Sequence, residues 1–190
     1  MARSMSILAA FVLVGVPSMA QAQTKSDPDG LVVRNQVKLT LAGAREIIAG
    51  AEARAAEMGL KVNIAVVDDG GHLLSFDRVD GARPASGYTA ITKATTAATF
   101  RAETGPIPKG SANPDPLLNL SLQNAAAASG GKLTTLYGGI PVIVDGQVVG
   151  GVGVGGGSGE QDAEIAKAGV ARFSKALKPS AETGKPVPVR

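Results

Sequence analysis

Acid–base and metal-binding chemistry in this chain depends on a few side chains. The chain has no cysteine and one histidine, which excludes disulfides, thiolate metal sites and multi-histidine metal centres. His72 is the only imidazole, suited to titrate near neutral pH or to ligate a metal; a hydrogen bond from its ring to a loop carbonyl is an equally good interpretation. Asp68 lies four residues earlier, in Asp-Asp-Gly-Gly-His. Since turns favour Asp before Gly, we interpret these carboxylates first as turn residues.

Lys93 and a glycine-rich run are the other candidates for chemistry. Lys93 stands among Ala and Thr; composition alone favours a surface lysine, although its small neighbours leave room for it to enter a pocket. Residues 151–156 satisfy G-x-G-x-x-G, but the further parallel strand and acidic residue of a dinucleotide fold are missing. What remains is a helix start at Gly156, Gly157 and Ser158, whose N–H groups either hold an anionic group or are satisfied within the chain.

Five elements are expected to position these residues in the first two thirds of the domain. Apolar residues at three- and four-residue steps predict a helix over 41–58, capped by Thr40. Residues 62–68 and 72–78 are rich in β-branched and apolar types around a Gly-Gly turn, which predicts a hairpin. Further helices are predicted over 86–102, with Ser86 as its cap, and over 117–128, joined by a proline-rich irregular loop.

The last third predicts three strands and a helix. Strands are expected over 132–137, 140–144 and 147–154, the last two joined by a tight Asp-Gly turn. Gly150, Gly151 and Gly153 weaken the final strand and indicate that another backbone or a ligand approaches it closely. Ser158 with Gln161 forms a capping box for a helix to about residue 177. Tight turns make neighbouring strands antiparallel, so the sequence predicts an α+β fold with a five-stranded antiparallel sheet covered by helices.

Composition and the chain ends indicate a small exported domain. The net charge of +3 comes without a basic cluster or aromatic platforms, which argues against a nucleic-acid partner. Arg3, an apolar run over 7–16 and Ala-Gln-Ala at 20–22 predict a cleaved signal peptide over 1–22, hence a periplasmic or secreted protein with no membrane span in the mature chain. We expect a flexible leader over 23–38, one domain over 39–178 and a loose tail over 179–190.

Four segments together carry a family resemblance. They occur in the family's order and spacing: LTLAGAREIIAGAEARAAEMG, VNIAVVDDGGHLLSFDRVDGARPAS, ITKATTAATF and YGGIPVIVDGQVVGGVGVGGGSGEQDAEIAKAG. On these segments the chain resembles the GlcG/HbpS family of haem-binding and so-called haem-degrading domains, which also form the C-terminal part of PduO-type proteins. The resemblance implies a profilin-like domain, a homo-oligomer of two or more subunits, and a small-molecule ligand such as haem or a related tetrapyrrole, bound non-covalently in an iron or redox-stress response.

The resemblance also implies a set of ligand-site residues. By matching motif they are Asp68, His72, Arg78, Lys93, Gly139, Gly156, Gly157 and Ser158. The helix over 41–58 holds no histidine, so His72 is the expected haem-iron ligand, with Met58, Tyr88 and Tyr137 as less usual choices. Arg78 or Lys93 is expected to pair with the propionates. The preferred function is ligand binding; the alternatives are an assembly scaffold and an enzyme acting on a small organic acid, with Lys93 as base or anion anchor oriented by Asp68.

Overall fold

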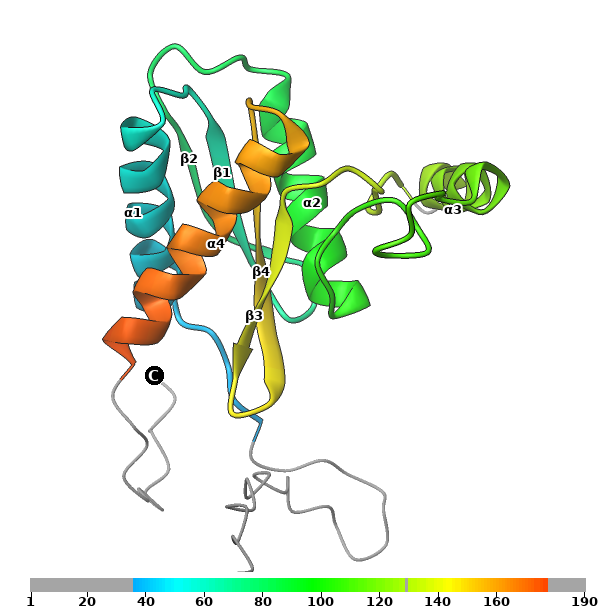
Figure 1. Ribbon diagram of the computed structural model, residues 1–190. Coiled ribbons are helices and arrows are strands. Elements are labelled where there is room, and N and C mark those ends of the chain that lie inside the picture. Colours follow the sequence, from blue (N-terminus) through cyan, green and yellow to red (C-terminus); the bar gives the residue numbers. More distant parts are fainter. Residues whose placement is uncertain (1–35, 129, 178–190) are drawn as a thin grey trace, which may run out of the picture.

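The computed structural model describes residues 36–128 and 130–177, so the predicted signal peptide, most of the leader and the tail lie outside the described residues. In this part of the chain a helix is followed by two strands, two helices, two more strands and a last helix (Figure 1). Their bounds are α1 Leu41–Glu57, β1 Asn63–Asp68, β2 Leu73–Arg78, α2 Ser86–Phe100, α3 Pro116–Ala128, β3 Gly139–Val144, β4 Gln147–Gly155 and α4 Gly159–Ala176. None of the described helices is long and apolar enough to cross a membrane.

The described strands form a four-stranded antiparallel sheet in the order β2-β1-β4-β3. Each outer strand is the hairpin partner of an inner one, and the inner pair β1 and β4 aligns Asn63 with Gly155 and Asp68 with Gly150. The α+β class and the antiparallel sheet are therefore confirmed. The hairpin turn Asp145-Gly146 has positive φ at both residues, as two-residue hairpin turns of this type require.

The predicted fifth strand, over 132–137, does not form. Its backbone binds threonine hydroxyls instead of a neighbouring strand: Thr134 N–H donates to Thr96 Oγ1 on α2 at 3.0 Å, and Leu136 N–H donates to Thr134 Oγ1 at 3.2 Å. The composition of this segment suits a strand. The hydrogen bond of Thr134, however, runs to α2, so the segment lies on the helix rather than in the sheet.

Helices cover both faces of the sheet. In Figure 1, α1 and α4 lie on one side and α2 on the other. Successive side chains of β1 point to opposite faces of the sheet and so contribute to two cores. Ile64 and Val66 belong to the core under α1 and α4, whereas Ala65 and Val67 pack against the alanines of α2. The first core is built mostly from branched aliphatic residues and the second almost wholly from alanine. A helix packed through alanines lies unusually close to the sheet.

Glycines in β4 make this close approach possible. A Cβ at Gly153 would lie 2.2 Å from the carbonyl oxygen of Ala90, and one at Gly151 would lie 2.4 Å from that of Ala94. The sequence predicted that a backbone or a ligand approaches this strand, and the approaching group is the backbone of α2. Because the residues of α2 are thereby held against β4, the position of Lys93 is fixed by main-chain contact.

The helix ends follow the predicted caps with one exception. Thr40 caps α1, and Ser158 and Gln161 form the complete capping box of α4. Ser86, predicted as the cap of α2, is instead its first helical residue, and Ala85 in the cap position makes no side-chain hydrogen bond. The Ser86 hydroxyl accepts a hydrogen bond from Arg83 Nε at 2.9 Å. Serine is thus used to hold an arginine at the start of α2.

Candidate ligand-binding site

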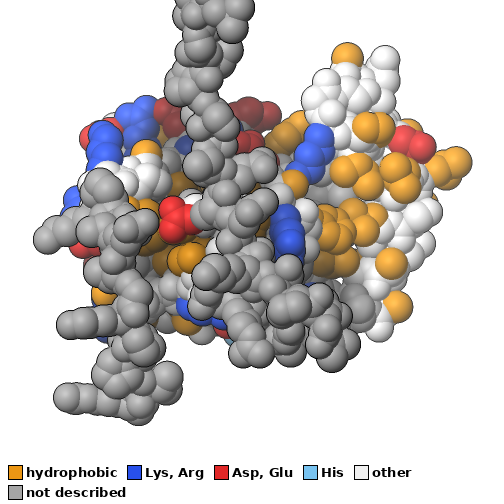
Figure 2. Space-filling model, turned by 90° about the horizontal axis from the view of Figure 1, so that it is seen from below, with side chains coloured by type: hydrophobic (Ala, Val, Ile, Leu, Met, Phe, Trp, Pro, Cys, Tyr) orange, Lys and Arg blue, Asp and Glu red, His pale blue; other side chains and the backbone are white. Residues whose placement is uncertain are grey.

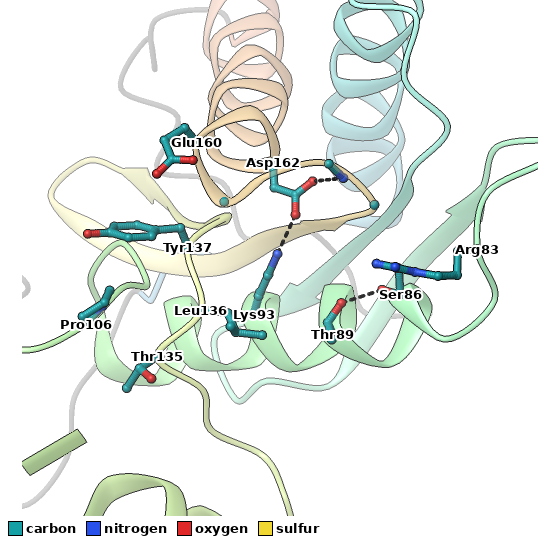
Figure 3. A pocket seen from close by; sticks show the side chains of 13 residues that line it. Arg83, Ser86, Thr89, Lys93, Pro106, Thr135, Leu136, Tyr137, Glu160 and Asp162 are labelled. Carbon is teal, nitrogen blue, oxygen red and sulfur yellow. Dashed lines mark hydrogen bonds and ion pairs between the residues drawn. The ribbon is translucent and has the colours of Figure 1, made fainter. Parts of the chain in front are cut away.

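A cavity of about 380 Å³ lies where the first turns of α2 and α4 meet the 135–137 segment (Figure 3). This volume is within the range of pockets that hold small molecules. Three stretches far apart in the sequence form it, one from each of these elements, together with Pro106. The lining residues are Arg83, Ser86, Thr89, Lys93, Pro106, Thr135, Leu136, Tyr137, Gly156, Gly157, Gly159, Glu160 and Asp162.

Lys93 and Asp162 form a buried ion pair in the wall of the cavity. Their side chains are 5% and 3% exposed, and Lys93 Nζ lies 2.7 Å from Asp162 Oδ2. The same ammonium donates to the carbonyl oxygen of Val154 at 2.7 Å, and Asp162 Oδ1 accepts from Gly157 N–H at 2.9 Å. The surface interpretation of Lys93 is therefore wrong. The pair connects α2, β4 and the start of α4 in one network.

The glycines that follow Tyr137 leave room for this pair. Gly138 has a φ of +110°, and a Cβ there would lie 2.6 Å from Asp162 Cβ and 3.0 Å from Lys93 Nζ. At Gly139 a Cβ would lie 2.4 Å from the carbonyl oxygen of Lys93. Gly139, a predicted ligand-site residue, thus lies directly behind the Lys93 backbone, where it sets how closely β3 approaches α2.

The cavity mouth combines an apolar wall with side chains of both charges. Leu136 and Tyr137 are about half exposed there, and the tyrosine ring lies between the backbones of Gly105 and Gly159. The exposed guanidinium of Arg83 stands at one side and the carboxylate of Glu160 at another (Figure 3). Since Lys93 is paired with Asp162, Arg83 is the cation of the lining without a carboxylate partner among the described residues.

The α4 start satisfies most of its own N–H groups. Gly157 N–H donates to Asp162, and Ser158 N–H donates to Gln161 Oε1 at 2.8 Å. This matches the second of the two interpretations of the glycine run, a turn with an internally satisfied cap. Glu160 lies in this first turn, and hydrogen bonds to its carboxylate lower its pKa. The larger effect comes from its own backbone N–H and the smaller one from the Ser158 hydroxyl. The turn therefore already holds an ionised carboxylate at the cavity mouth.

Asp68 and His72 lie at the other end of β1 from the cavity. β1 begins at Asn63, beside Gly155 and the cavity, and ends at Asp68. The His72 side chain is 83% exposed, and its Nδ1 lies 3.3 Å from Asp68 Oδ1. The same oxygen accepts from the backbone N–H groups of Gly70 and His72, both at 2.9 Å. The first interpretation of Asp68, as the residue that organises the turn, is thus realised.

Partial burial acts to raise the pKa of Asp68, but the hydrogen bonds from the His72 and Gly70 backbones and the nearby imidazole outweigh it and lower that pKa. An acid whose pKa is lowered by folding binds fewer protons in the folded chain than in the unfolded chain. Its stabilising effect is therefore present above the ordinary Asp pKa of about 4 and is lost as the pH falls through the lowered value.

Asp68→Asn is accordingly expected to lower the free energy of unfolding at neutral pH. The difference in free energy of unfolding between the variant and the wild type should shrink as the pH falls below about 4. Urea unfolding of both proteins across this range measures the difference. Asp145→Asn, which changes an exposed carboxylate in the β3–β4 turn, is the control and should leave the pH dependence unchanged. A wild-type advantage over Asp68→Asn that stays constant with pH would contradict this account of the turn.

The structure brings together only part of the predicted site. Lys93, Gly156 and Gly157 line the cavity, and Ser158 lies next to them in the chain. Arg78 ends β2 opposite Asn63, at the cavity end of the sheet, but is exposed and is not part of the cavity lining. The described residues hold no group of three or more His, Asp or Glu side chains arranged for a metal ion.

Sequence reasoning missed the importance of Asp162 and Arg83. Asp162 lies in register with the buried residues Ile165, Ala166 and Gly169 of α4. A carboxylate on the apolar stripe of a helix indicates a buried partner, because charged residues are almost never fully buried unpaired. That signal was present in the sequence. Arg83 carried no comparable signal, since it lies in an irregular segment.

The fold and cavity define the protein's class: an α+β domain with a pocket of small-molecule size beside a buried ion pair. The model of the family described as haem degrading protein HbpS-like matches residues 39–171. The chain therefore belongs to the HbpS-like family. Protein GlcG of Escherichia coli strain K12 is 41% identical over 122 residues, which are 64% of this chain and 84% of GlcG.

Solved structures agree with this assignment. A crystal structure of HbpS shares 34% identity with this chain, covers 72% of it and 91% of HbpS, and superposes with a TM-score of 0.59. The crystal structure of a PduOC:haem complex shares 28% identity, covers 72% of this chain and 95% of PduOC, and gives a TM-score of 0.60. Among the proteins similar to this chain, one was thus crystallised with haem.

Proposed function

We propose that this protein binds a small ligand in the cavity between α2 and α4, and that the ligand is haem or a related tetrapyrrole. The observation that carries the proposal is the composition of the cavity mouth: an apolar and aromatic wall of Leu136 and Tyr137 beside the guanidinium of Arg83. Membership of the HbpS-like family and likeness to PduOC, which was crystallised with haem, support the choice of ligand.

The residues present fit one edge and one face of such a ligand. Tyr137 and Leu136 offer exposed apolar surface to a flat ring, and Arg83 supplies a charge-assisted hydrogen-bond donor for a carboxylate. Lys93 is less suited to the propionate role predicted for it, because Asp162 and the Val154 carbonyl already engage its ammonium. Bound haem would supply an iron centre with redox chemistry.

Tyr137 is the iron-ligand candidate that this proposal selects. Its phenol belongs to the cavity lining, and tyrosinate is a known axial ligand of haem iron. His72, the ligand expected from the sequence, is an alternative only for haem held on the exposed hairpin at the far end of β1. The two candidates are therefore separable by mutation.

Titration of the purified protein with hemin, followed by the Soret band, tests the proposal. We expect a saturable Soret shift, a different band position and weaker binding in Tyr137→Phe, and weaker binding in Arg83→Gln because a propionate partner is lost. His72→Ala and Tyr88→Phe, which alter exposed side chains outside the cavity lining, are the controls.

Two outcomes would count against the proposal in different ways. A wild-type protein without a saturable Soret shift removes haem as the ligand. A shift that disappears in His72→Ala and is unchanged in Tyr137→Phe moves the site from the cavity to the hairpin.

Export and a role in iron or redox stress remain part of the proposal. They rest on the predicted signal peptide over 1–22, which lies outside the described residues, and on the family resemblance. A binding protein of this kind would meet its ligand in the periplasm or outside the cell.

A further inference from the structure

Asn63 is a fully buried polar residue at the cavity end of the sheet. It is the first residue of β1. Its side-chain amide donates to the carbonyl oxygen of Arg83 at 3.0 Å and, over a longer distance of 3.4 Å, to that of Gly155. Arg83 lies just before α2, and Gly155 is the last residue of β4. One side chain thus connects the segment before α2 to the end of β4, and Arg83 and Gly156 carry both stretches into the cavity lining.

The acceptor half of this amide is unsatisfied. Asn63 Oδ1 is buried and accepts no hydrogen bond from the described residues. Its surroundings are apolar: a Cβ on Gly87 would lie 3.5 Å from Asn63 Oδ1 and 3.2 Å from Phe76 Cζ. A buried acceptor without a donor lowers stability, and an apolar side chain of similar size would avoid that loss. Only the donor half of the amide does what an apolar residue could not do, which is to hold the Arg83 carbonyl.

The Arg83 side chain is fixed by a second contact. Its Nε donates to Ser86 Oγ at 2.9 Å, and Ser86 is itself buried. Ser86 N–H also donates to the Arg83 carbonyl oxygen at 3.1 Å, so that oxygen accepts hydrogen bonds from both Asn63 and Ser86. Figure 3 shows the guanidinium next to Ser86 at one side of the cavity. Backbone and side chain of Arg83 are therefore both held by buried partners.

Arg83 differs from the arginines on the α1 and α4 side of the molecule. There Arg172 pairs with Glu46 at 3.0 Å and Arg54 pairs with Glu164. Basic and acidic side chains gather together on that side, at the left of Figure 2. Arg83 binds a serine hydroxyl instead, and its two terminal nitrogens have no partner among the described residues. Those nitrogens form the end of the guanidinium that can hold both oxygens of a carboxylate.

We propose that Asn63 is a positioning residue, which fixes the Arg83 backbone so that the guanidinium is preorganised for end-on, two-point binding of a carboxylate on the cavity ligand. Asn63 acts through Arg83 and does not touch the ligand, because it is fully buried and is not part of the cavity lining. Less side-chain freedom is then lost when the ligand binds. This inference rests on the proposed function and adds the residue that makes the cavity selective for carboxylate-bearing ligands.

Soret titration with hemin and with hemin dimethyl ester, in which both propionates are esterified, measures this selectivity. The wild type is expected to bind hemin about 10-fold or more tightly than the ester, the effect of a charge-assisted hydrogen-bonded pair. In Asn63→Leu this ratio should fall below about 3-fold, with the affinity for the ester little changed. Thr95→Val is the matched control: Thr95 is also buried and donates one side-chain hydrogen bond, to the Gly71 carbonyl at 3.2 Å in the β1–β2 turn, and the variant should keep the wild-type ratio.

A double-variant cycle separates positioning from a general effect on the fold. If Asn63 acts through Arg83, adding Asn63→Leu to Arg83→Gln should lower the hemin affinity no further. A merely structural role would weaken hemin and ester alike and would add to the effect of Arg83→Gln, and either result would overturn the inference. Ser86→Ala, which removes the acceptor of Arg83 Nε from a helix that tolerates alanine, should lower the ratio too and decides the matter if Asn63→Leu does not fold.

The free protein offers a test that does not depend on haem. NMR relaxation of the Arg83 Nε–H bond reports how rigidly the guanidinium is held. Its order parameter should be clearly lower in Asn63→Leu than in the wild type and unchanged in Thr95→Val. Equal order parameters in Asn63→Leu and the wild type would overturn the inference, as would equal wild-type affinities for hemin and its ester. A wild type that responds to neither compound removes haem as the ligand, and the Arg83 order parameter then decides whether Asn63 positions Arg83.

Discussion

Replacing Lys93 by methionine is expected to lower the free energy of unfolding by about 3–5 kcal/mol, the usual cost of removing one partner of a buried ion pair. The variant leaves the Asp162 carboxylate almost fully buried without its ammonium partner. It also removes the hydrogen bond that the Lys93 ammonium donates to the Val154 carbonyl oxygen at 2.7 Å. Methionine fills a similar volume, so the loss measures the charge and the hydrogen bonds more than the packing. Urea or guanidinium unfolding gives the difference.

Two further proteins make this result interpretable. Lys167→Met removes the lysine of an exposed pair, Lys167 with Glu103 at 3.0 Å, and is expected to cost less than about 1 kcal/mol. The double variant Lys93→Met with Asp162→Leu removes both charges and is expected to recover much of the lost stability. If Lys93→Met unfolds at the same denaturant concentration as Lys167→Met, the buried pair does not hold α2, β4 and α4 together.

The same proteins assign a role to Lys93. A double variant that is stable and binds hemin like the wild type would make Lys93 a structural residue that positions the α4 start. A stable double variant that no longer responds to hemin would return Lys93 to the ligand site predicted from the sequence. The geometry favours the structural role, because two of its three N–H donors already have partners within the chain.

Elements with a strong local pattern were predictable from the sequence. The helix that became α1 has apolar residues at helical spacing and a cap at Thr40, and the β3–β4 hairpin has Asp-Gly between two valine-rich runs. The 132–137 segment was wrongly predicted as a strand because its local composition is that of a strand. The hydrogen bond that holds it on α2 is accepted by Thr96, which is nearly forty residues away from Thr134, and no local pattern indicates that contact.

The site was predictable only in part for the same reason. The sequence singled out Lys93 by its unusual neighbours, but the residue that it pairs with is Asp162, 69 positions later. The family motifs gave His72 and Lys93 equal standing, whereas the sheet separates them because one belongs to a hairpin tip and the other to the middle of α2. The cavity depends on the long-range pairing of Lys93 on α2 with Asp162 on α4. A single sequence indicates only that each of the two residues is unusual in its own segment.

Gly153→Ala is expected to lower the free energy of unfolding by about 3 kcal/mol or more, which is at or above the upper end of the usual destabilisation by overpacking. The added methyl group would stand 2.2 Å from the Ala90 carbonyl oxygen and 2.4 Å from the Ala94 backbone nitrogen. Backbone atoms of a helix cannot move aside as a side-chain end can, so α2 must lift from β4 as a unit. That movement would also carry Lys93 away from Asp162 and open the wall of the cavity.

Gly70→Ala is the matched control, because it adds the same methyl group where the nearest atom, His72 Nδ1 at 2.9 Å, belongs to an exposed side chain that can turn outward and give up only its contact with Asp68. We expect Gly70→Ala to unfold within about 1 kcal/mol of the wild type and Gly153→Ala to unfold far earlier in thermal and denaturant scans. Equal stability of the two variants would mean that β4 can recede from α2, and that the ion pair rather than glycine packing fixes how closely helix and sheet approach.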